Sequence, residues 1–158
     1  MQARFVKWIT LGCAMLLAAT SAPARQHAAE PAFKYIGGTV GLPEHCKGKL
    51  ELSQQEMIFD CGAGSLSIPY DNIRYMEYRT SISRKVKRMK PQWKVKPETF
   101  SSLFGRKGNR YFTITYQESE DSPTEVLVLE VSPDAMRPYL AEIDLKVGHR
   151  IEVENLED

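Results

Sequence analysis

The chain is poor in the residues from which metal and nucleophile sites are built. Its 158 residues include only three histidines and three cysteines. His27, His45 and His149 lie far apart, and no two of them have the spacing of metal ligands. The Gly-x-Ser-x-Gly nucleophile motif is missing, and the glycine-rich stretch 62–65 lies between predicted strands rather than before a helix. We therefore expect no enzyme activity, no metal and no cofactor.

No apolar run in the sequence reaches the roughly 20 residues that a membrane-spanning helix needs. The main one, residues 8–20, follows a basic start without acids and precedes Ala22-Pro23-Ala24. This order is typical of a secretory signal peptide. We expect cleavage after Ala24, with Arg25 as the new N-terminus and a periplasmic or secreted product.

A lipid anchor at Cys13 is the alternative route out of the cell. Leu11-Gly12-Cys13-Ala14 resembles the lipobox of bacterial lipoproteins, in which the cysteine is lipidated. Only a few apolar residues precede Cys13, and the apolar run continues beyond it. Both features favour cleavage after Ala24.

The mature chain has little net charge. Removing residues 1–24 leaves 158 − 24 = 134 residues, with 19 basic and 20 acidic side chains and a net charge of −1. That length suits one domain. We assign residues 25–32 to a flexible lead-in, 33–153 to the domain and 154–158 to a tail.

Only two cysteines, Cys46 and Cys61, remain in the mature chain. In an oxidising compartment such a pair predicts a disulfide. If strands 49–52 and 56–60 pair with Leu52 opposite Gln55, Cys46 and Cys61 face each other directly, with Cα atoms about 4.5 Å apart. Zinc is the competing interpretation, but no cysteine–histidine spacing supplies four ligands.

Alternating apolar and polar residues predict a mainly β domain. The residues at 112, 114 and 116 and those at 127, 129 and 131 should face the core. The predicted strands cover residues 33–40, 49–52, 56–60, 65–69, 73–83, 111–117 and 125–131.

The apolar period changes after residue 131 and predicts one helix. Ser132 is a suitable N-cap, Pro133 fits the first helical position, and Gly148 suits the position after the last turn. The apolar stripe consists of Met136, Leu140, Ile143 and Val147. Because a helix cannot bury such a stripe alone, we expect it to cover the open end of a curved two-sheet barrel.

Several short motifs resemble the GRAM and pleckstrin-homology (PH)-like pattern. They are Gly48-Lys49-Leu50-Glu51-Leu52, Met57-Ile58-Phe59, Leu66-Ser67-Ile68-Pro69-Tyr70 before Ile73, and Val147-Gly148-His149-Arg150-Ile151, the last being similar to the end of bacterial PH-like proteins of unknown function. The resemblance implies a small PH-like barrel of about seven antiparallel strands capped by a C-terminal amphipathic helix. A lipocalin-like or other small sandwich is the alternative. Export and a disulfide set this chain apart from cytosolic GRAM domains that bind phosphoinositides.

The positive charge is concentrated in residues 84–110, which we interpret as a basic loop insertion. This segment has ten cations against one acid, Glu98, so it carries +9 and the rest of the mature chain −10. Such separation creates a local field that attracts anions although the net charge is small. The candidate binding residues are Arg84, Lys85, Lys87, Arg88, Lys90, Trp93, Lys94 and Lys96.

Two functions from different classes fit this segment. It can contact an anionic membrane surface or ligand, where cations and aromatic side chains both contribute. Alternatively, the domain is a structural or adaptor module that binds a protein partner in the cell envelope, for example along a strand edge. A long solvated loop whose aromatic side chains fold back on the barrel is the simplest interpretation. We expect no nucleic-acid partner and no small-molecule substrate.

Overall fold

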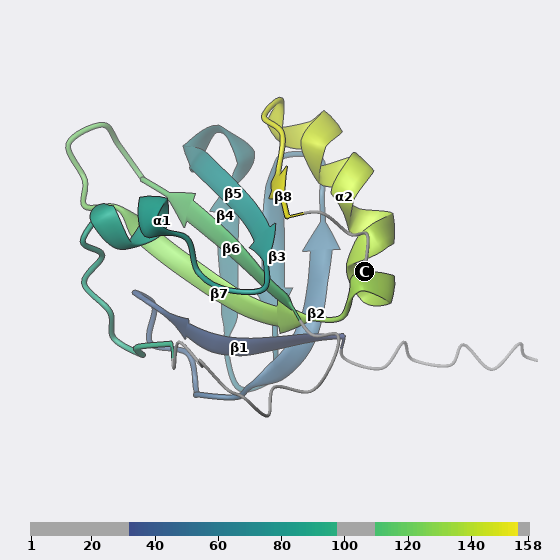
Figure 1. Ribbon diagram of the computed structural model, residues 1–158, viewed down its shortest axis with the longest axis horizontal. Helices are drawn as coiled ribbons and strands as arrows, with labels where there is room; N and C mark the ends of the chain where they lie inside the picture. The colour runs from purple at the N-terminus through teal and green to yellow at the C-terminus, as the bar shows by residue number, and fades with distance from the viewer. Residues whose placement is uncertain (1–31, 98–109, 155–158) are drawn as a thin grey trace, which may run out of the picture.

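The computed structural model describes residues 32–97 and 110–154, so the predicted signal peptide lies outside the described residues (Figure 1). The expected mainly β domain with one long C-terminal helix is confirmed. The elements are β1 (Phe33–Gly38), β2 (Lys47–Leu52), β3 (Glu56–Asp60), β4 (Ser65–Pro69), η1 (Tyr70–Asn72), β5 (Ile73–Arg79), α1 (Arg84–Arg88), β6 (Arg110–Tyr116), β7 (Glu125–Val131), α2 (Pro133–Val147) and β8 (Glu152–Val153). Neither helix within the described ranges is long and apolar enough to span a membrane.

The strands form one open sheet in the order β4-β3-β2-β1-β7-β6-β5-β8. All neighbours are antiparallel except β5 and β8, which run parallel. The expectation of about seven antiparallel strands was therefore wrong in one respect: the C-terminal segment adds an eighth, parallel strand. In the described part of the chain β4 and β8 are the two ends of this order, so the pairing leaves the sheet open where we expected a closed barrel.

The sheet curves around one apolar core. Figure 1 shows β2, β3 and β4 crossing the direction of β5, β6 and β7, with α2 beside them. The inward residues predicted for β6 and β7 are confirmed, since Phe112, Ile114, Leu127 and Leu129 are fully buried in this cluster. Phe33 of β1 meets Tyr139 of α2 edge to face, with ring centroids 5.0 Å apart.

The predicted ends of α2 are also confirmed. The Ser132 hydroxyl accepts a hydrogen bond from the Ala135 amide at 3.3 Å. Gly148 has φ 72°, a left-handed conformation that favours glycine after a helix. Met136 and Ile143 are fully buried, and the Lys146 ammonium donates to the carbonyl of Ser53 at 2.6 Å. The helix is therefore fixed both to the core and to the β2–β3 hairpin.

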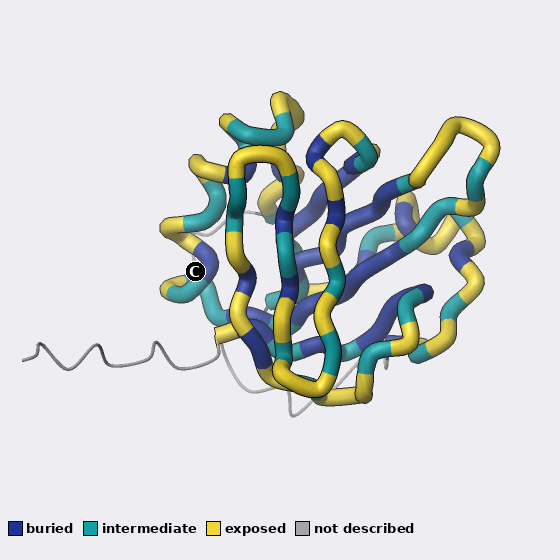
Figure 2. Tube along the Cα trace, turned by 180° about the vertical axis from the view of Figure 1, so that it is seen from behind, coloured by how far each residue is buried: buried dark blue, intermediate teal, exposed yellow. Residues whose placement is uncertain are grey.

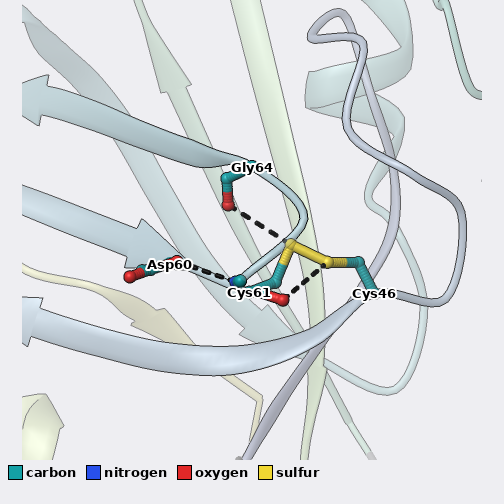
Figure 3. The surroundings of a disulfide bond; sticks show 5 residues. Cys46, Asp60, Cys61 and Gly64 are labelled. Carbon is teal, nitrogen blue, oxygen red and sulfur yellow. Dashed lines mark hydrogen bonds between the residues drawn. A yellow bond between two sulfur atoms is a disulfide. The ribbon is translucent and has the colours of Figure 1, made fainter.

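The predicted disulfide between Cys46 and Cys61 is present, and such a bond is typical of an oxidising environment (Figure 3). The register that we predicted for it was wrong by two residues, because Leu52 pairs with Met57. Ser53 widens the turn: its hydroxyl accepts from the Gln55 and Glu56 amides at 3.2 and 3.1 Å.

A two-residue shift leaves every side chain on its predicted face. It does move the cysteines out of direct opposition, because Cys46 precedes β2 and Cys61 follows β3. Their Cα atoms are 5.8 Å apart, within the range of a disulfide but longer than the separation predicted for a facing pair.

Strand β5 is shorter and less regular than predicted. It ends at Arg79 rather than at residue 83, because the Thr80 amide and hydroxyl both donate to Glu154 of the C-terminal segment, at 2.8 and 2.7 Å. A register shift between Ile73 and Tyr75 puts Ile73 and Met76 on the same, inner face.

Both faces of the sheet are buried only in the half formed by β5, β6 and β7. Figure 2 shows buried and exposed residues alternating along β2–β4, whereas β5–β7 are almost continuously buried. The outer residues of β5–β7 include Tyr75, Thr115, Val126 and Val128, all buried. A segment of the chain must therefore cover this outer face, and that segment is the basic one.

Candidate functional site

Residues 84–97, which we call the basic strap, carry the described part of the basic segment. They contain seven cations and no acid. The first five residues form α1, whose N-cap is Ser83: its hydroxyl accepts from the Val86 amide at 3.3 Å. The predicted loop insertion thus begins with a short helix, and at its other end Arg110 belongs to β6.

The inner side of the basic strap packs on the outer face of the sheet. Val86 is fully buried and Ile82, just before the strap, is 5% exposed. Met89 and Trp93 pack partly buried against the same cluster. Its sheet residues come from β1, β5, β6 and β7 and are Ile36, Tyr75, Tyr111, Val126 and Val128. The strap therefore crosses the sheet from β5 to β1 and is anchored along its length.

The end of the strap is fixed by backbone contacts to β1. The amide of Gly38 donates to the Val95 carbonyl at 2.9 Å, and the amides of Lys94 and Val95 donate to the Gly38 carbonyl at 3.0 and 3.1 Å. Pro97 lies directly over Gly37, where a Cβ would approach the proline ring to 2.7 Å. A glycine at this position allows the close approach.

The outer side of the strap is a row of cations. Arg84, Lys87, Arg88, Lys90, Lys94 and Lys96 are all exposed. None of these six side chains forms a hydrogen bond or ion pair within the described ranges. The structure thus brings the predicted binding residues together on one surface, with two exceptions.

Lys85 and Trp93 are the exceptions. The Lys85 ammonium lies 2.9 Å from the Glu152 carboxylate and 3.6 Å from the centroid of the Tyr75 ring. Trp93 is half-buried on the sheet. Both side chains hold the strap in place, so six free cations, rather than all eight predicted residues, form the accessible surface.

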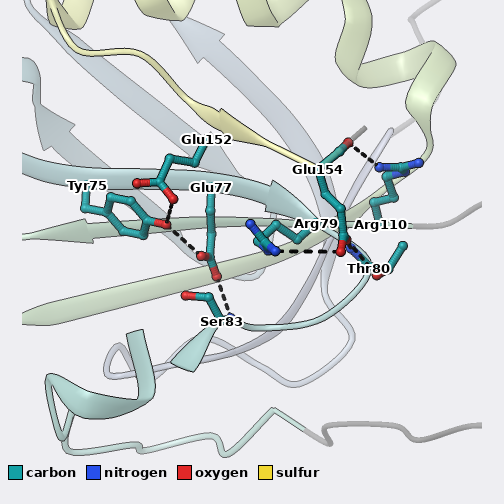
Figure 4. Close-up of polar contacts among 8 residues, drawn as sticks. All are labelled: Tyr75, Glu77, Arg79, Thr80, Ser83, Arg110, Glu152 and Glu154. Atoms are coloured by element: carbon teal, nitrogen blue, oxygen red, sulfur yellow. Dashed lines mark hydrogen bonds and ion pairs between the residues drawn. The ribbon is translucent and has the colours of Figure 1, made fainter. Parts of the chain in front are cut away.

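A polar cluster beneath α1 was missed by sequence analysis (Figure 4). Tyr75 Oη lies 2.9 Å from Glu77 Oε2 and 2.7 Å from Glu152 Oε2. Glu77 Oε1 accepts the Ser83 amide at 2.9 Å, and Glu77 is 0% exposed. The cluster connects β5, β8 and the N-cap of α1. The available signal was the single acid of β5, which lies between Met76 and Tyr78 in the middle of the strand.

The hydrogen bond from Tyr75 lowers the pKa of Glu152, and the Lys85 ammonium lowers it further. We expect Tyr75→Phe to raise the pKa of Glu152 more than Lys85→Met does, as followed by NMR of the carboxyl carbon. Glu154, whose pKa is lowered by hydrogen bonds from Thr80 instead, serves as the internal reference. The same pKa of Glu152 in the wild type and in both variants would contradict the contacts of Glu152 with Tyr75 and Lys85.

The sign of the stability effect follows from that depressed pKa. The ionised form of Glu152 is favoured in the fold, so its contribution is present above the unfolded pKa and is lost as pH falls through the folded one. Acidification through the folded-state pKa of Glu152 should therefore weaken the contact between β8 and Lys85 of α1.

Among the described residues no group of three or more His, Cys, Asp or Glu side chains has the arrangement of a metal site. His45 lies before β2 and His149 after α2, while His27 lies outside the described residues.

Comparison with known proteins assigns the chain to no family. No protein-family model matches the chain, and no curated protein matches it.

Proposed function

We propose that the mature chain is an exported, non-enzymatic PH-like binding module that contacts an anionic membrane surface, or an anionic ligand displayed there, through the basic strap. One observation carries the proposal: the apolar side chains of the strap face the sheet while its free cations face outward. A strap held in this way presents its charges without first having to be ordered, so binding costs less conformational entropy.

The strand order supports the PH-like and GRAM-like part of the proposal. Strands β1 to β4 follow one another across the sheet, β5 to β7 form a second meander, and β1 lies beside β7. The amphipathic helix α2 comes directly after β7, at the place that the sequence resemblance implies.

The disulfide and the predicted signal peptide support an envelope location for this module. The disulfide requires an oxidising compartment, and we expect the signal peptide to end at Ala24. The intact mass of the exported protein should therefore correspond to a chain beginning at Arg25. A diacylglycerol on Cys13 would contradict this and identify a lipoprotein.

Charge reversal tests the contact surface. We expect Arg84→Glu, Lys87→Glu and Arg88→Glu together to weaken binding to anionic vesicles at least about 100-fold, because each cation near such a surface contributes about 1 kcal/mol. The thermal midpoint should change little, since these three exposed side chains form no ion pair within the described ranges. Vesicle co-sedimentation measures the binding.

A matched variant separates surface position from net charge. Lys47 and Lys49 of β2 and Arg137 of α2 are exposed, on elements that contribute no residue to the cluster under the strap. Changing all three to Glu alters the net charge by the same amount and should leave most of the binding intact. Equal loss in the two triple variants would mean that the strap has no special role.

A protein partner in the cell envelope is the second candidate function. The observation in its favour is β4, an edge strand that pairs only with β3 in the described part of the chain. Strand addition at this edge would rest on backbone hydrogen bonds and would depend little on salt. Attraction to an anionic surface weakens steeply with ionic strength, so a salt series distinguishes the two.

A further inference from the structure

A second group of donors and cations, outside the basic strap, surrounds one acidic residue where β5 ends (Figure 4). The amide and the hydroxyl of Thr80 both donate to Oε2 of Glu154, at 2.8 and 2.7 Å. The Arg79 guanidinium lies 3.7 Å from Oε1 of the same side chain. Arg110, at the start of β6, donates from Nη1 to the carbonyl of Glu154 at 2.8 Å. Two strands therefore direct donors at one residue of the C-terminal segment.

The surroundings of the Glu154 carboxylate favour a negative charge. The hydrogen bonds from Thr80 lower the pKa of Glu154, and the charges of Arg79 and Arg110 lower it further. Guanidinium groups combined with backbone amides and hydroxyls are the donors with which proteins bind carboxylate and phosphate ions. The carboxylate of Glu154 is therefore held as a bound anion would be.

One carboxylate does not use all the donors of this group. Among the described residues Arg79 forms no hydrogen bond, and its one ion pair is the contact of 3.7 Å with Glu154. A guanidinium has five N–H donors, and its hydrogen bonds to anionic oxygens are shorter, about 2.7–2.9 Å. A carboxylate whose first oxygen is held by Thr80 has one oxygen left for Arg79, whereas a phosphate monoester has two. A phosphate group therefore matches these donors more fully.

The side chain of Glu154 can leave these donors without unfolding its neighbours. It is 39% exposed, and Thr80 is exposed as well, so the donors are accessible from solvent. The backbone is held separately, because the Glu154 amide donates to the Tyr78 carbonyl at 3.1 Å and Ile151 is buried in the core. Rotation of one side chain is therefore enough to free Thr80 and Arg79.

We propose that Arg79, Thr80 and Arg110 form a binding site for a phosphate monoester, and that the Glu154 carboxylate occupies this site as an internal competitor until the ligand displaces it. None of these residues belongs to the basic strap at 84–97. The site lies where β5 ends, shortly before the strap begins at Arg84. The inference goes beyond the proposed function, because a soluble phosphate ester can fill this site without a membrane.

Removal of the competitor tests the site. We expect Glu154→Ala to bind inorganic phosphate at least about tenfold more tightly than the wild type, since a site that its own side chain fills for more than about 90% of the time has its affinity reduced to that extent. Adding Arg79→Gln to this variant should remove most of the gain. Isothermal titration calorimetry of the mature protein at constant ionic strength measures the affinities.

Glu51→Ala is the matched control for net charge. Glu51 is exposed on β2, which β1, β7 and β6 separate from β5 in the sheet. Its removal changes the net charge by the same amount as Glu154→Ala, but it should leave the phosphate affinity within about twofold of the wild type, because salt screens distant exposed charges. An equal gain in affinity in the two variants would overturn the proposal.

Glu154→Gln keeps the test decisive if Glu154→Ala fails to fold. The glutamine oxygen still accepts from Thr80, so the end of β5 keeps its contact, while the neutral amide competes less well with an anion. Phosphate should shift the NMR signal of the Thr80 amide in this variant at a lower concentration than in the wild type. A Thr80 signal that phosphate moves in neither protein would overturn the proposal.

Vesicles identify the source of the phosphate group. Phosphatidic acid presents a phosphate monoester, whereas phosphatidylglycerol presents a diester. A preference for phosphatidic acid that increases in Glu154→Ala supports a lipid headgroup as the ligand, and phosphate binding without that preference supports a soluble phosphate ester. If neither vesicle binds while the phosphate titrations give the expected result, the proposed membrane function fails and the phosphate site stands.

Discussion

Replacing Cys46 and Cys61 together by alanine should lower the free energy of unfolding by roughly 2–5 kcal/mol. The disulfide joins positions 15 residues apart, before β2 and after β3. It also anchors the hairpin to β1, because the Tyr35 amide donates to the Cys46 carbonyl at 2.8 Å. Urea denaturation of the mature protein, monitored by tryptophan fluorescence, measures the change.

Thiol chemistry provides the control for this prediction. Native mature protein should not react with an alkylating reagent unless a reductant is added, and the reduced wild type should resemble the double variant in stability. Quantitative alkylation of Cys46 and Cys61 without reductant would show that the two are not bonded.

Truncation of Ile143 should also cost about 2–5 kcal/mol, because this side chain of α2 is fully buried in the core. Leu140→Ala should cost less than Ile143→Ala, since Leu140 is only partly buried. Thermal or urea unfolding of the two variants gives the difference directly.

The same helix supplies a matched control. Leu145 is 85% exposed, so Leu145→Ala truncates an apolar side chain of similar size that packs little against the core. This substitution should change the free energy of unfolding by no more than about 0.5 kcal/mol. Glu142→Ala should also fall within about 0.5 kcal/mol, because its contact with Lys146 is a half-exposed i, i+4 pair. If Ile143 and Leu145 were equally tolerant, α2 would not be closing the core.

Local signals were enough to predict the strands and the long helix. Strands β4 and β7 have the predicted bounds, and the caps of α2 lie at Ser132 and Gly148 as expected. Each of these elements is bounded by residues with a strong conformational preference, such as Pro69 at the end of β4. Periodicity and capping act over a few residues, so they can be read without knowledge of the fold.

Register and closure depend on contacts that the sequence pattern does not specify. A shift by two residues in the β2–β3 hairpin keeps Leu50 and Phe59 on the core face, so the apolar pattern cannot distinguish the two registers. The Ser53 hydroxyl decides between them. Likewise, the end of β5 depends on Glu154, which is far along the chain.

The sequence of β7 indicates that a segment of the chain covers the outer face of the sheet, where the basic strap lies. Its run Val126 to Leu129 is apolar on both faces, which is typical of a strand buried on both sides. Within this run we predicted Leu127 and Leu129 as core residues, and we interpreted the basic segment as a loop. Val86 lies between basic residues in the sequence, but its side chain is fully buried on the outer face of the sheet and anchors the basic strap there.

Binding of the mature wild-type protein to anionic vesicles, compared at low salt and at about 0.15 M salt, tests the proposed membrane contact most directly. Neutral vesicles are the control. The exposed cations of the basic strap predict co-sedimentation with anionic vesicles at low salt, a steep decrease at the higher salt concentration, and no binding to neutral vesicles. Absence of binding to anionic vesicles even at low salt would contradict the proposal and favour a protein partner at the β4 edge.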